Sequence, residues 1–127
     1  MGYIYYNANP LGRQTDDCVK RALSKALDYS WDRVHVELAV MALAKAGIET
    51  ENDIWGEYLE RKGFDRYPIP DTCPFCYTIK DFCNDNPNGT FIIGTGSHVV
   101  CVIDGDYYDT WDSGDKIPLY CFMRKEG

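Results

Sequence analysis

The chain has 127 residues, of which 45% are hydrophobic and 14% aromatic, and this apolar content is too high for a disordered chain. A length near that of a typical domain predicts one domain over residues 1–127 that buries a core without disulfides. The formal net charge of −7 repels phosphate backbones and anionic membrane surfaces, which argues against nucleic acid and membranes as partners.

The amino-terminal stretch carries no sign of an export signal. It lacks a basic segment followed by an apolar core, and no later segment is long and apolar enough to cross a bilayer. We therefore expect a cytoplasmic protein whose six cysteines are free thiols. Each cysteine then needs its own explanation as a core residue, a metal ligand, a redox group or a nucleophile.

Helices are expected in the first two thirds of the chain. Residues 1–15 have no period and indicate an irregular lead-in, after which apolar residues recur at helical spacing from about Cys18. A second helix follows Ser30 as its cap and extends toward Gly47, a candidate left-handed terminator. The remaining expectations here are a third helix through 54–59 that stops near Gly63, a proline-rich loop over 65–76 and a short helix over 78–84.

Strands are expected in the last third, where the hydrophobic period falls to two or vanishes. Residues 104–106, Asp-Gly-Asp, are typical of a hairpin, so the strands on either side of them should be adjacent and antiparallel. Helices followed by a meandering sheet, without strand–helix alternation, predict the α+β class. The four expected strands cover 90–93, 98–103, 107–112 and 119–123.

Cys18 is the first candidate catalytic residue. At the amino end of a helix, unsatisfied backbone N–H groups and the positive end of the helix dipole stabilise negative charge, which favours a reactive thiolate. The alternative is a small apolar residue of the core. The carboxylates of Asp16 and Asp17 also favour a neutral thiol unless they point away or cap the helix. Cys18 therefore needs a neighbouring base to qualify as a nucleophile.

His98 is the candidate base, because imidazole is the side chain best matched to proton transfer near neutral pH. It begins an apolar strand and follows four small residues, 94–97, which could leave it at an open edge of the sheet. The only other histidine is His35. His35 lies inside the second predicted helix between two valines, where a structural role is the simpler explanation.

Two carboxylates after the hairpin, Asp109 and Asp112, could orient the imidazole of His98. If the turn has two residues, His98 shares a face of the sheet with Asp109. If the loop has three residues, with Gly105 in the left-handed conformation, His98 lies opposite Asp112. Direct opposition suits a close hydrogen bond, so we favour Asp112 and keep Asp109 as the alternative.

Two segments carry a resemblance to a known family. Asp-Cys-Val-Lys-Arg-Ala at 17–22 opens the first helix, and His-Val-Val-Cys-Val-Ile-Asp-Gly at 98–105 precedes Tyr-Asp-Thr-Trp-Asp at 108–112. With this order of Cys, His and Asp, the chain resembles the papain-like cysteine peptidase fold, and within it small bacterial and phage proteins similar to bacteriocin-processing (double-glycine leader) peptidases. The resemblance implies amino-terminal helices packed on a carboxyl-terminal antiparallel sheet, with a triad of Cys18 as nucleophile, His98 as base and acid, and Asp112 as orienting residue.

The same resemblance implies a role for Gln14. Such enzymes place a glutamine shortly before the nucleophile, where its side-chain amide and the backbone N–H of the cysteine hold the tetrahedral oxyanion. Gln14 is the only candidate, four positions before Cys18 and closer than in papain, and the papain-type stretch Cys-Gly-Ser-Cys-Trp is absent. The implied reaction forms an acyl-enzyme and needs no metal or organic cofactor.

A CxxC pair, Cys73 and Cys76, is followed seven residues later by Cys83, so a zinc site and a redox dithiol have to be considered. A structural zinc site needs four ligands, and no second CxxC or HxxxH is present. A thioredoxin-like motif follows a strand, whereas a proline-rich loop precedes this one. Acidic residues at 104–106 and 109–115 alternate with Tyr and Trp, which fits a strand better than a calcium loop. We therefore expect neither a metal nor a cofactor.

Two classes of function remain open. The first is a cysteine-dependent amide-bond hydrolase, a peptidase or deamidase that acts on a peptide or protein substrate through Cys18, His98 and Asp112. The second is a catalytically silent papain-like module of a phage or bacterium that binds and modulates another protein, in the host cytoplasm if phage-encoded. The two classes share a fold and differ in whether a reactive Cys18 lies within hydrogen-bond reach of His98.

Overall fold

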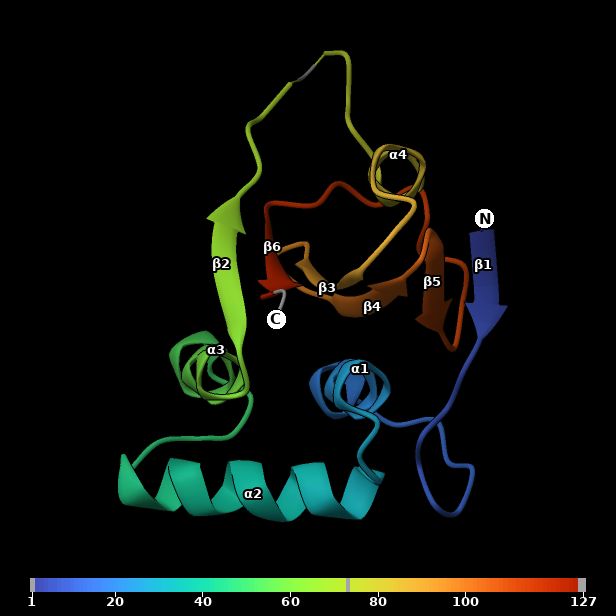
Figure 1. The fold of residues 1–127 in the computed structure, drawn as a ribbon. Coiled ribbons are helices and arrows are strands. Elements are labelled where there is room, and N and C mark those ends of the chain that lie inside the picture. The colour runs from blue at the N-terminus through green and yellow to red at the C-terminus, as the bar shows by residue number, and fades with distance from the viewer. Residues whose placement is uncertain (1, 73, 126–127) are drawn as a thin grey trace.

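The computed structural model describes residues 2–72 and 74–125, and it has the α+β architecture expected from the sequence. Over these residues it contains four helices and one six-stranded mixed sheet with the strand order β1-β5-β4-β3-β6-β2 (Figure 1). The helices are α1 (Cys18–Leu27), α2 (Trp31–Ala44), α3 (Asn52–Arg61) and α4 (Ile79–Asp85). The strands are β1 (Gly2–Tyr5), β2 (Phe64–Pro68), β3 (Thr90–Gly94), β4 (Val99–Ile103), β5 (Asp106–Asp109) and β6 (Tyr120–Arg124).

All four helices lie where the sequence predicts them, and side chains cap the starts of α2 and α4, whereas the expected side-chain cap of α1 is not formed by Asp17. Helix α1 begins at Cys18, and the side chain of Ser30 caps α2 by accepting a hydrogen bond from the backbone N–H of Arg33 at 3.1 Å. Thr78 and Asp81 form a reciprocal capping box at the start of α4. Over the described residues, none of these helices has both the length and the hydropathy that a bilayer-spanning segment needs.

Two edge strands correct the sequence-based expectation of a purely antiparallel sheet. Strand β1, inside the expected irregular lead-in, pairs in parallel with β5, and β2, which begins just before the expected loop over 65–76, pairs antiparallel with β6. Both are short strands, and both depend on partners far along the chain. Pro68 is compatible with β2 because an edge strand does not need every N–H for the ladder.

The β4–β5 hairpin has a two-residue turn at Asp104 and Gly105, which both have positive φ, 51° and 82°. The register pairs Ile103 with Asp106 across this turn. Strand β5 therefore ends at Asp109, and Asp112 lies in the loop beyond it rather than in the strand predicted over 107–112. This is the register that places His98 and Asp109 on one face, so the three-residue alternative is wrong.

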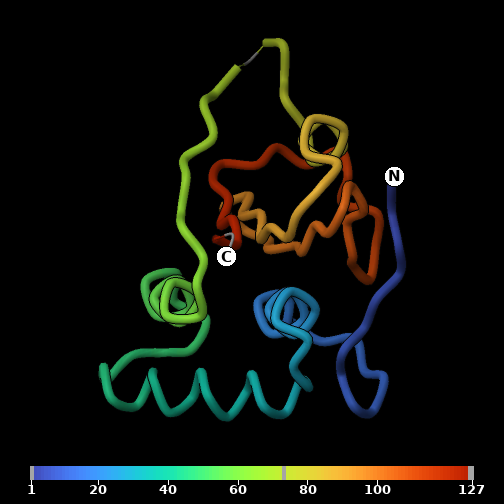
Figure 2. The backbone as a smooth tube through the Cα atoms, in the orientation of Figure 1, coloured from blue at the N-terminus to red at the C-terminus, as the bar shows by residue number. Residues whose placement is uncertain are grey.

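The sheet is covered on both faces, and successive residues of its central strands point to opposite sides. Helices α1 and α3 pack on one face, α2 lies across these two helices on the side away from the sheet, and α4 packs on the other face (Figures 1 and 2). On β3, Ile92 faces the three-helix side while Phe91 and Ile93 face α4. Helix α1 lies against β4 and β5, which brings Cys18 to the end of the sheet where β4 begins.

Candidate active site

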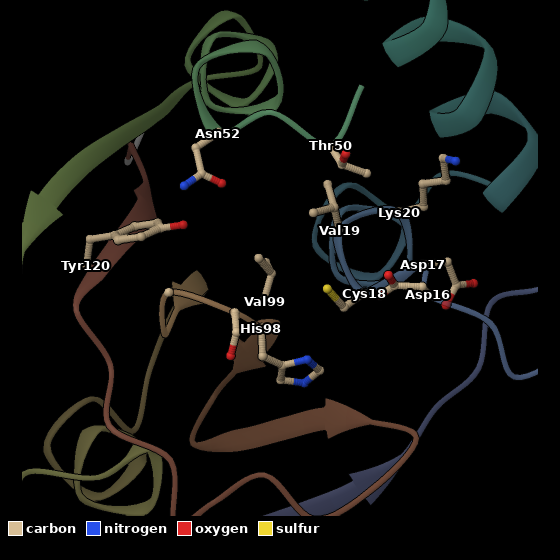
Figure 3. A pocket seen from close by; sticks show the side chains of 12 residues that line it. Asp16, Asp17, Cys18, Val19, Lys20, Thr50, Asn52, His98, Val99 and Tyr120 are labelled. Carbon is tan, nitrogen blue, oxygen red and sulfur yellow. The ribbon is translucent and has the colours of Figure 1, made fainter. Parts of the chain in front are cut away.

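Cys18 and His98 line one pocket between the helical layer and the sheet. The pocket has a volume of about 210 Å³. Cys18 comes from the first turn of α1, His98 from the loop that leads into β4, and Asn52 and Tyr120 come from α3 and β6 (Figure 3). The structure therefore brings together the two residues that the sequence predicts as nucleophile and base.

The position of Cys18 follows from the way α1 starts. Asp17 is the residue before the helix, and its carbonyl accepts the first helical hydrogen bond, from the N–H of Arg21 at 2.8 Å. The N–H groups of Cys18, Val19 and Lys20 belong to the first helical turn and have no carbonyl acceptor inside the helix. The half-buried Cys18 side chain thus lies beside backbone donors that favour negative charge.

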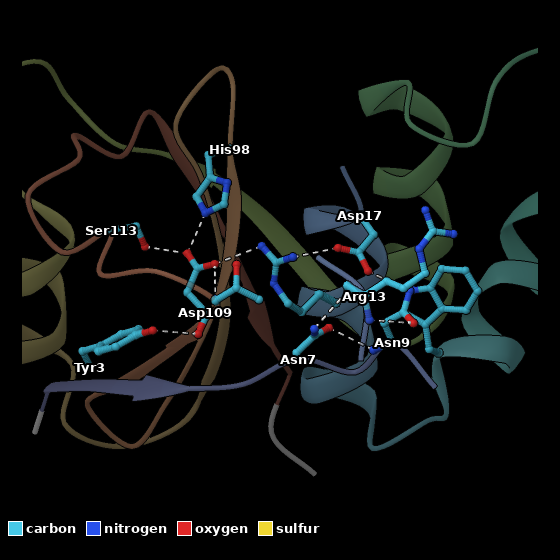
Figure 4. Close-up of polar contacts among 11 residues, drawn as sticks. Tyr3, Asn7, Asn9, Arg13, Asp17, His98, Asp109 and Ser113 are labelled. Atoms are coloured by element: carbon cyan, nitrogen blue, oxygen red, sulfur yellow. Dashed lines mark hydrogen bonds and ion pairs between the residues drawn. The ribbon is translucent and has the colours of Figure 1, made fainter. Parts of the chain in front are cut away.

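Asp109 is the carboxylate that lies against His98. The two side chains are joined between His98 Nε2 and Asp109 Oδ2 at 2.6 Å, and the carboxylate is fully buried (Figure 4). The same oxygen accepts a hydrogen bond from Ser113 Oγ at 2.7 Å, and Oδ1 accepts one from the backbone N–H of Thr110 at 2.8 Å. Burial alone would raise the pKa of Asp109, but the hydrogen bonds from His98 and Ser113 outweigh it and hold the pKa below its ordinary value.

His98 carries a proton over most of the physiological range. Burial by itself would lower the pKa of its imidazole, but the hydrogen bond with Asp109 and the proximity of Cys18 outweigh that effect and raise the pKa to about 9. Since Nε2 donates to the ionised Asp109, Nδ1 is the ring nitrogen left for Cys18. The ring is therefore held by the carboxylate of Asp109, and Cys18 lies in the same pocket.

Asp112, the carboxylate favoured from the sequence, has other partners. Its Oδ1 accepts hydrogen bonds from the Tyr107 hydroxyl and from the N–H of Gly114, and the residue is exposed. The short turn of the hairpin is the reason: it places Asp109 on the His98 face and leaves Asp112 beyond the end of β5. The expected contact between Asp112 and His98 is replaced by the contact with Asp109.

Gln14, the expected oxyanion donor, is exposed and is not among the described residues that line the pocket. The segment before α1 is shaped by Asn7 and Asn9, whose side-chain oxygens accept backbone hydrogen bonds from the same loop. The polar groups that do line the pocket include Asn52 and Tyr120. The Oδ1 of Asn52 accepts a hydrogen bond from Trp55 Nε1 at 3.1 Å, and its Nδ2 has no hydrogen-bond acceptor among the described residues.

A buried arginine is the main polar residue that the sequence reasoning missed. Arg21 is 4% exposed, and it donates to Asp17 Oδ1 at 2.7 Å and to Asp109 Oδ1 at 2.9 Å. One sequence signal was available: Asp17 and Arg21 are four apart on a helix, the spacing of an ion pair. That Arg21 also reaches Asp109 depends on how α1 packs on the sheet.

The remaining cysteines do not assemble a metal site within residues 2–72 and 74–125, where no group of three or more His, Cys, Asp and Glu side chains is placed to hold an ion. Cys73 lies outside the described residues, so the CxxC motif of Cys73 and Cys76 stays untested. Cys83 is buried against the α4 face of the sheet, and burial raises the pKa of its thiol to about 11. Cys83 is thus packed as a core residue.

Comparison with known proteins returns no family model, no curated protein and no solved structure that matches this chain. The function therefore has to be inferred from the geometry and the charges of the pocket around Cys18 and His98.

Proposed function

We propose that this protein is a cysteine-dependent amide-bond hydrolase of papain-like type. In this proposal Cys18 is the nucleophile, His98 the general acid and base, and Asp109 the residue that orients the imidazole. The observation that carries it is the position of the His98 ring, which is hydrogen-bonded to Asp109 at 2.6 Å and lines the same pocket as Cys18. A thiol, an imidazole and a carboxylate in this series are the functional parts of a cysteine hydrolase.

The reaction would proceed through a thioester. The sulfur of Cys18 attacks the carbonyl carbon of the substrate, and a carbon–sulfur bond forms as the carbonyl oxygen becomes an oxyanion. His98 then gives its proton to the leaving nitrogen, the carbon–nitrogen bond breaks and an amine departs. A water molecule, deprotonated by His98, attacks the thioester, the carbon–sulfur bond breaks and a carboxylic acid is released, which leaves Cys18 as a thiolate beside the protonated His98.

Backbone groups are the proposed oxyanion donors. The first-turn N–H groups of α1, including that of Cys18, lie next to the nucleophile and have no acceptor inside the helix. Gln14 takes no part in this proposal because its side chain is exposed outside the pocket. A substrate carbonyl bound at Cys18 would thus receive its stabilisation from the helix end.

The position of Gln14 also favours a second candidate function, a papain-like module that binds another protein without catalysis. An enzyme of this kind that lacks one oxyanion donor would turn over roughly 10²–10³ times more slowly. In such a module the pair of Cys18 and His98 would remain as a structural feature of the pocket.

The test is the alkylation rate of each cysteine by iodoacetamide as a function of pH, read by peptide mass spectrometry. We expect Cys18 to react fastest and to remain reactive near pH 6, where an ordinary cysteine is almost entirely a neutral thiol. His98→Ala should abolish this low-pH reactivity, and a library of fluorogenic peptide amides should yield products that depend on Cys18. A Cys18 that reacts like the other thiols with either residue at position 98 would exclude the hydrolase and leave the binding module.

A further inference from the structure

The buried side chain of Arg21 connects the two halves of the proposed site. It lies on α1 one turn after Cys18, and its two terminal nitrogens donate to different carboxylates, Asp17 at 2.7 Å and Asp109 at 2.9 Å. Asp17 directly precedes the nucleophile, and Asp109 holds His98. One guanidinium therefore contacts both the start of the helix that carries Cys18 and the carboxylate that orients the imidazole.

We call the ion pairs that join Asp17, Arg21 and Asp109 the bridge, and further hydrogen bonds hold the carboxylate at each of its ends. The second oxygen of Asp17 accepts a hydrogen bond from Trp31 Nε1 at 2.9 Å, which ties the bridge to α2. The second oxygen of Asp109 accepts from His98 and from Ser113. Asp17 and Arg21 are about 95% buried, and Asp109 is fully buried, so the contacts are little screened by water.

We propose that Arg21 is a positioning residue that sets the distance and orientation between Cys18 and His98 by holding Asp17 and Asp109 at the same time. This inference rests on the proposed function, since it assigns Arg21 a role in that site. The planar guanidinium presents its N–H groups in a fixed fork, so one side chain can satisfy two carboxylates in different elements. A lysine ammonium is a point charge on a flexible stem and cannot hold both in one geometry.

The charges of the bridge agree with this role. Asp17 and Asp109 are two buried carboxylates, and Arg21 and the protonated His98 supply two positive charges that balance them. Without Arg21 the carboxylate of Asp109 would keep His98 as a partner but would lose its link to α1. The helix carrying Cys18 would then be free to shift relative to the imidazole.

The test compares Arg21→Lys with the wild-type chain by the pH profile of Cys18 alkylation. We expect at least a tenfold loss of rate near pH 6, where reactivity depends on His98, and a change below about twofold near pH 10, where any exposed thiol is ionised. A purely structural role would change both rates together. Arg33→Lys, the same substitution in the exposed ion pair with Glu37, is the matched control and should leave the profile unchanged.

The outcomes separate this inference from the proposed function. If the wild-type profile depends on His98 but Arg21→Lys preserves it, the positioning role is wrong and the hydrolase stands. If the wild-type Cys18 shows no low-pH reactivity, the proposed function itself fails.

If Arg21→Lys does not fold, ¹⁵N NMR of the wild-type chain decides the matter. The guanidinium N–H protons of Arg21 should exchange slowly with water and shift as His98 titrates near pH 9. Fast exchange, without a shift in that range, would overturn the inference.

Discussion

Asp109 and Asp112 are three residues apart, yet they differ both in burial and in their hydrogen-bond partners. Asp109 is fully buried and contacts His98, Arg21 and Ser113. Asp112 is exposed and contacts the hydroxyl of Tyr107. A charged hydrogen bond inside the protein interacts far more strongly than the same bond in water, so only Asp109 can hold the proton on the imidazole.

Asp109→Asn therefore tests which carboxylate orients His98. Removing the charge while keeping the shape should lower the pKa of His98 from about 9 toward the ordinary value of about 6.5. The ring ¹⁵N shifts of His98, followed by NMR against pH, measure this directly. Asp112→Asn is the matched control and should leave the pKa of His98 unchanged. If Asp112→Asn lowered the pKa of His98 more than Asp109→Asn does, Asp112 would be the residue that orients the imidazole.

The raised pKa of His98 also predicts how stability depends on pH. In the unfolded chain the imidazole has a pKa near 6.5, and in the folded chain about 9. The contribution of this ionisation to the free energy of unfolding is complete below about pH 6.5 and is lost as the pH rises through about 9, an effect of about 3 kcal/mol. Urea unfolding at several pH values, with the wild-type chain and His98→Gln, measures it as the difference between the two curves. Parallel curves would show that folding does not raise the pKa.

At the scale of the elements, the pairing of β3 with β6 depends on a glycine. Gly94 lies opposite Tyr120, and a Cβ at position 94 would lie 2.1 Å from the Tyr120 ring. That ring packs against Trp55 and Phe122 and is mostly buried, so it has little room to move. The close approach of the ring to the strand is possible only without a side chain at position 94.

Gly94→Ala should therefore destabilise the protein by roughly 1–3 kcal/mol through overpacking. Urea unfolding of the single variants and of the double variant with Tyr120→Ala forms a double-mutant cycle. We expect most of the cost of Gly94→Ala to disappear once Tyr120 is shortened. An equal cost in both backgrounds would mean that the backbone of β3, and not the Tyr120 ring, resists the substitution.

A helix or strand could be predicted from the sequence where the residues that determine it lie within a few positions of one another. All four helices could be predicted, because periodicity and capping residues such as Ser30 and Thr78 act within a few positions. The end of α2 was less predictable: Ala46, not Gly47, has the left-handed conformation, with φ of 53°. Strands β1 and β2 were missed because each is short and is held by a strand at the other end of the chain.

The residues of the candidate site also fall into two groups, those that a local sequence signal predicts and those whose position depends on the tertiary structure. Cys18 and His98 could be identified from a helix start and a strand start, and the structure places both on one pocket. Asp109 was chosen over Asp112 by the length of one turn, which composition alone did not decide. Arg21 was missed because its burial follows from the packing of α1 on the sheet.

At the scale of the whole molecule, the order of the strands predicts where the fold opens first. Strand β4 has a hydrogen-bonded neighbour on each side, whereas β1 is a short edge strand with one neighbour. Local openings at an edge need less free energy than openings that require global unfolding. The part of the site on β4 and β5 should therefore be among the most persistent regions of the protein.

Amide hydrogen exchange measures this difference. We expect the N–H of Tyr6, which bonds the carbonyl of Asp109 at 2.9 Å, to exchange at least about 100-fold faster than the N–H groups of Val100 and Val102. Because all of the compared amides are hydrogen-bonded, a difference in their exchange rates does not simply reflect whether an N–H is exposed to water. Equal protection of these amides would mean that β1 opens only together with the rest of the sheet.

The separation of Cys18 from its partners along the chain has a consequence during synthesis. His98 follows Cys18 by about 80 positions, so at roughly 5–20 residues per second the ribosome delivers the thiol several seconds before the imidazole. The three helices on one side of the sheet emerge before its central strands. A nascent chain of this protein thus carries the Cys18 thiol for several seconds before His98 has been added to the chain.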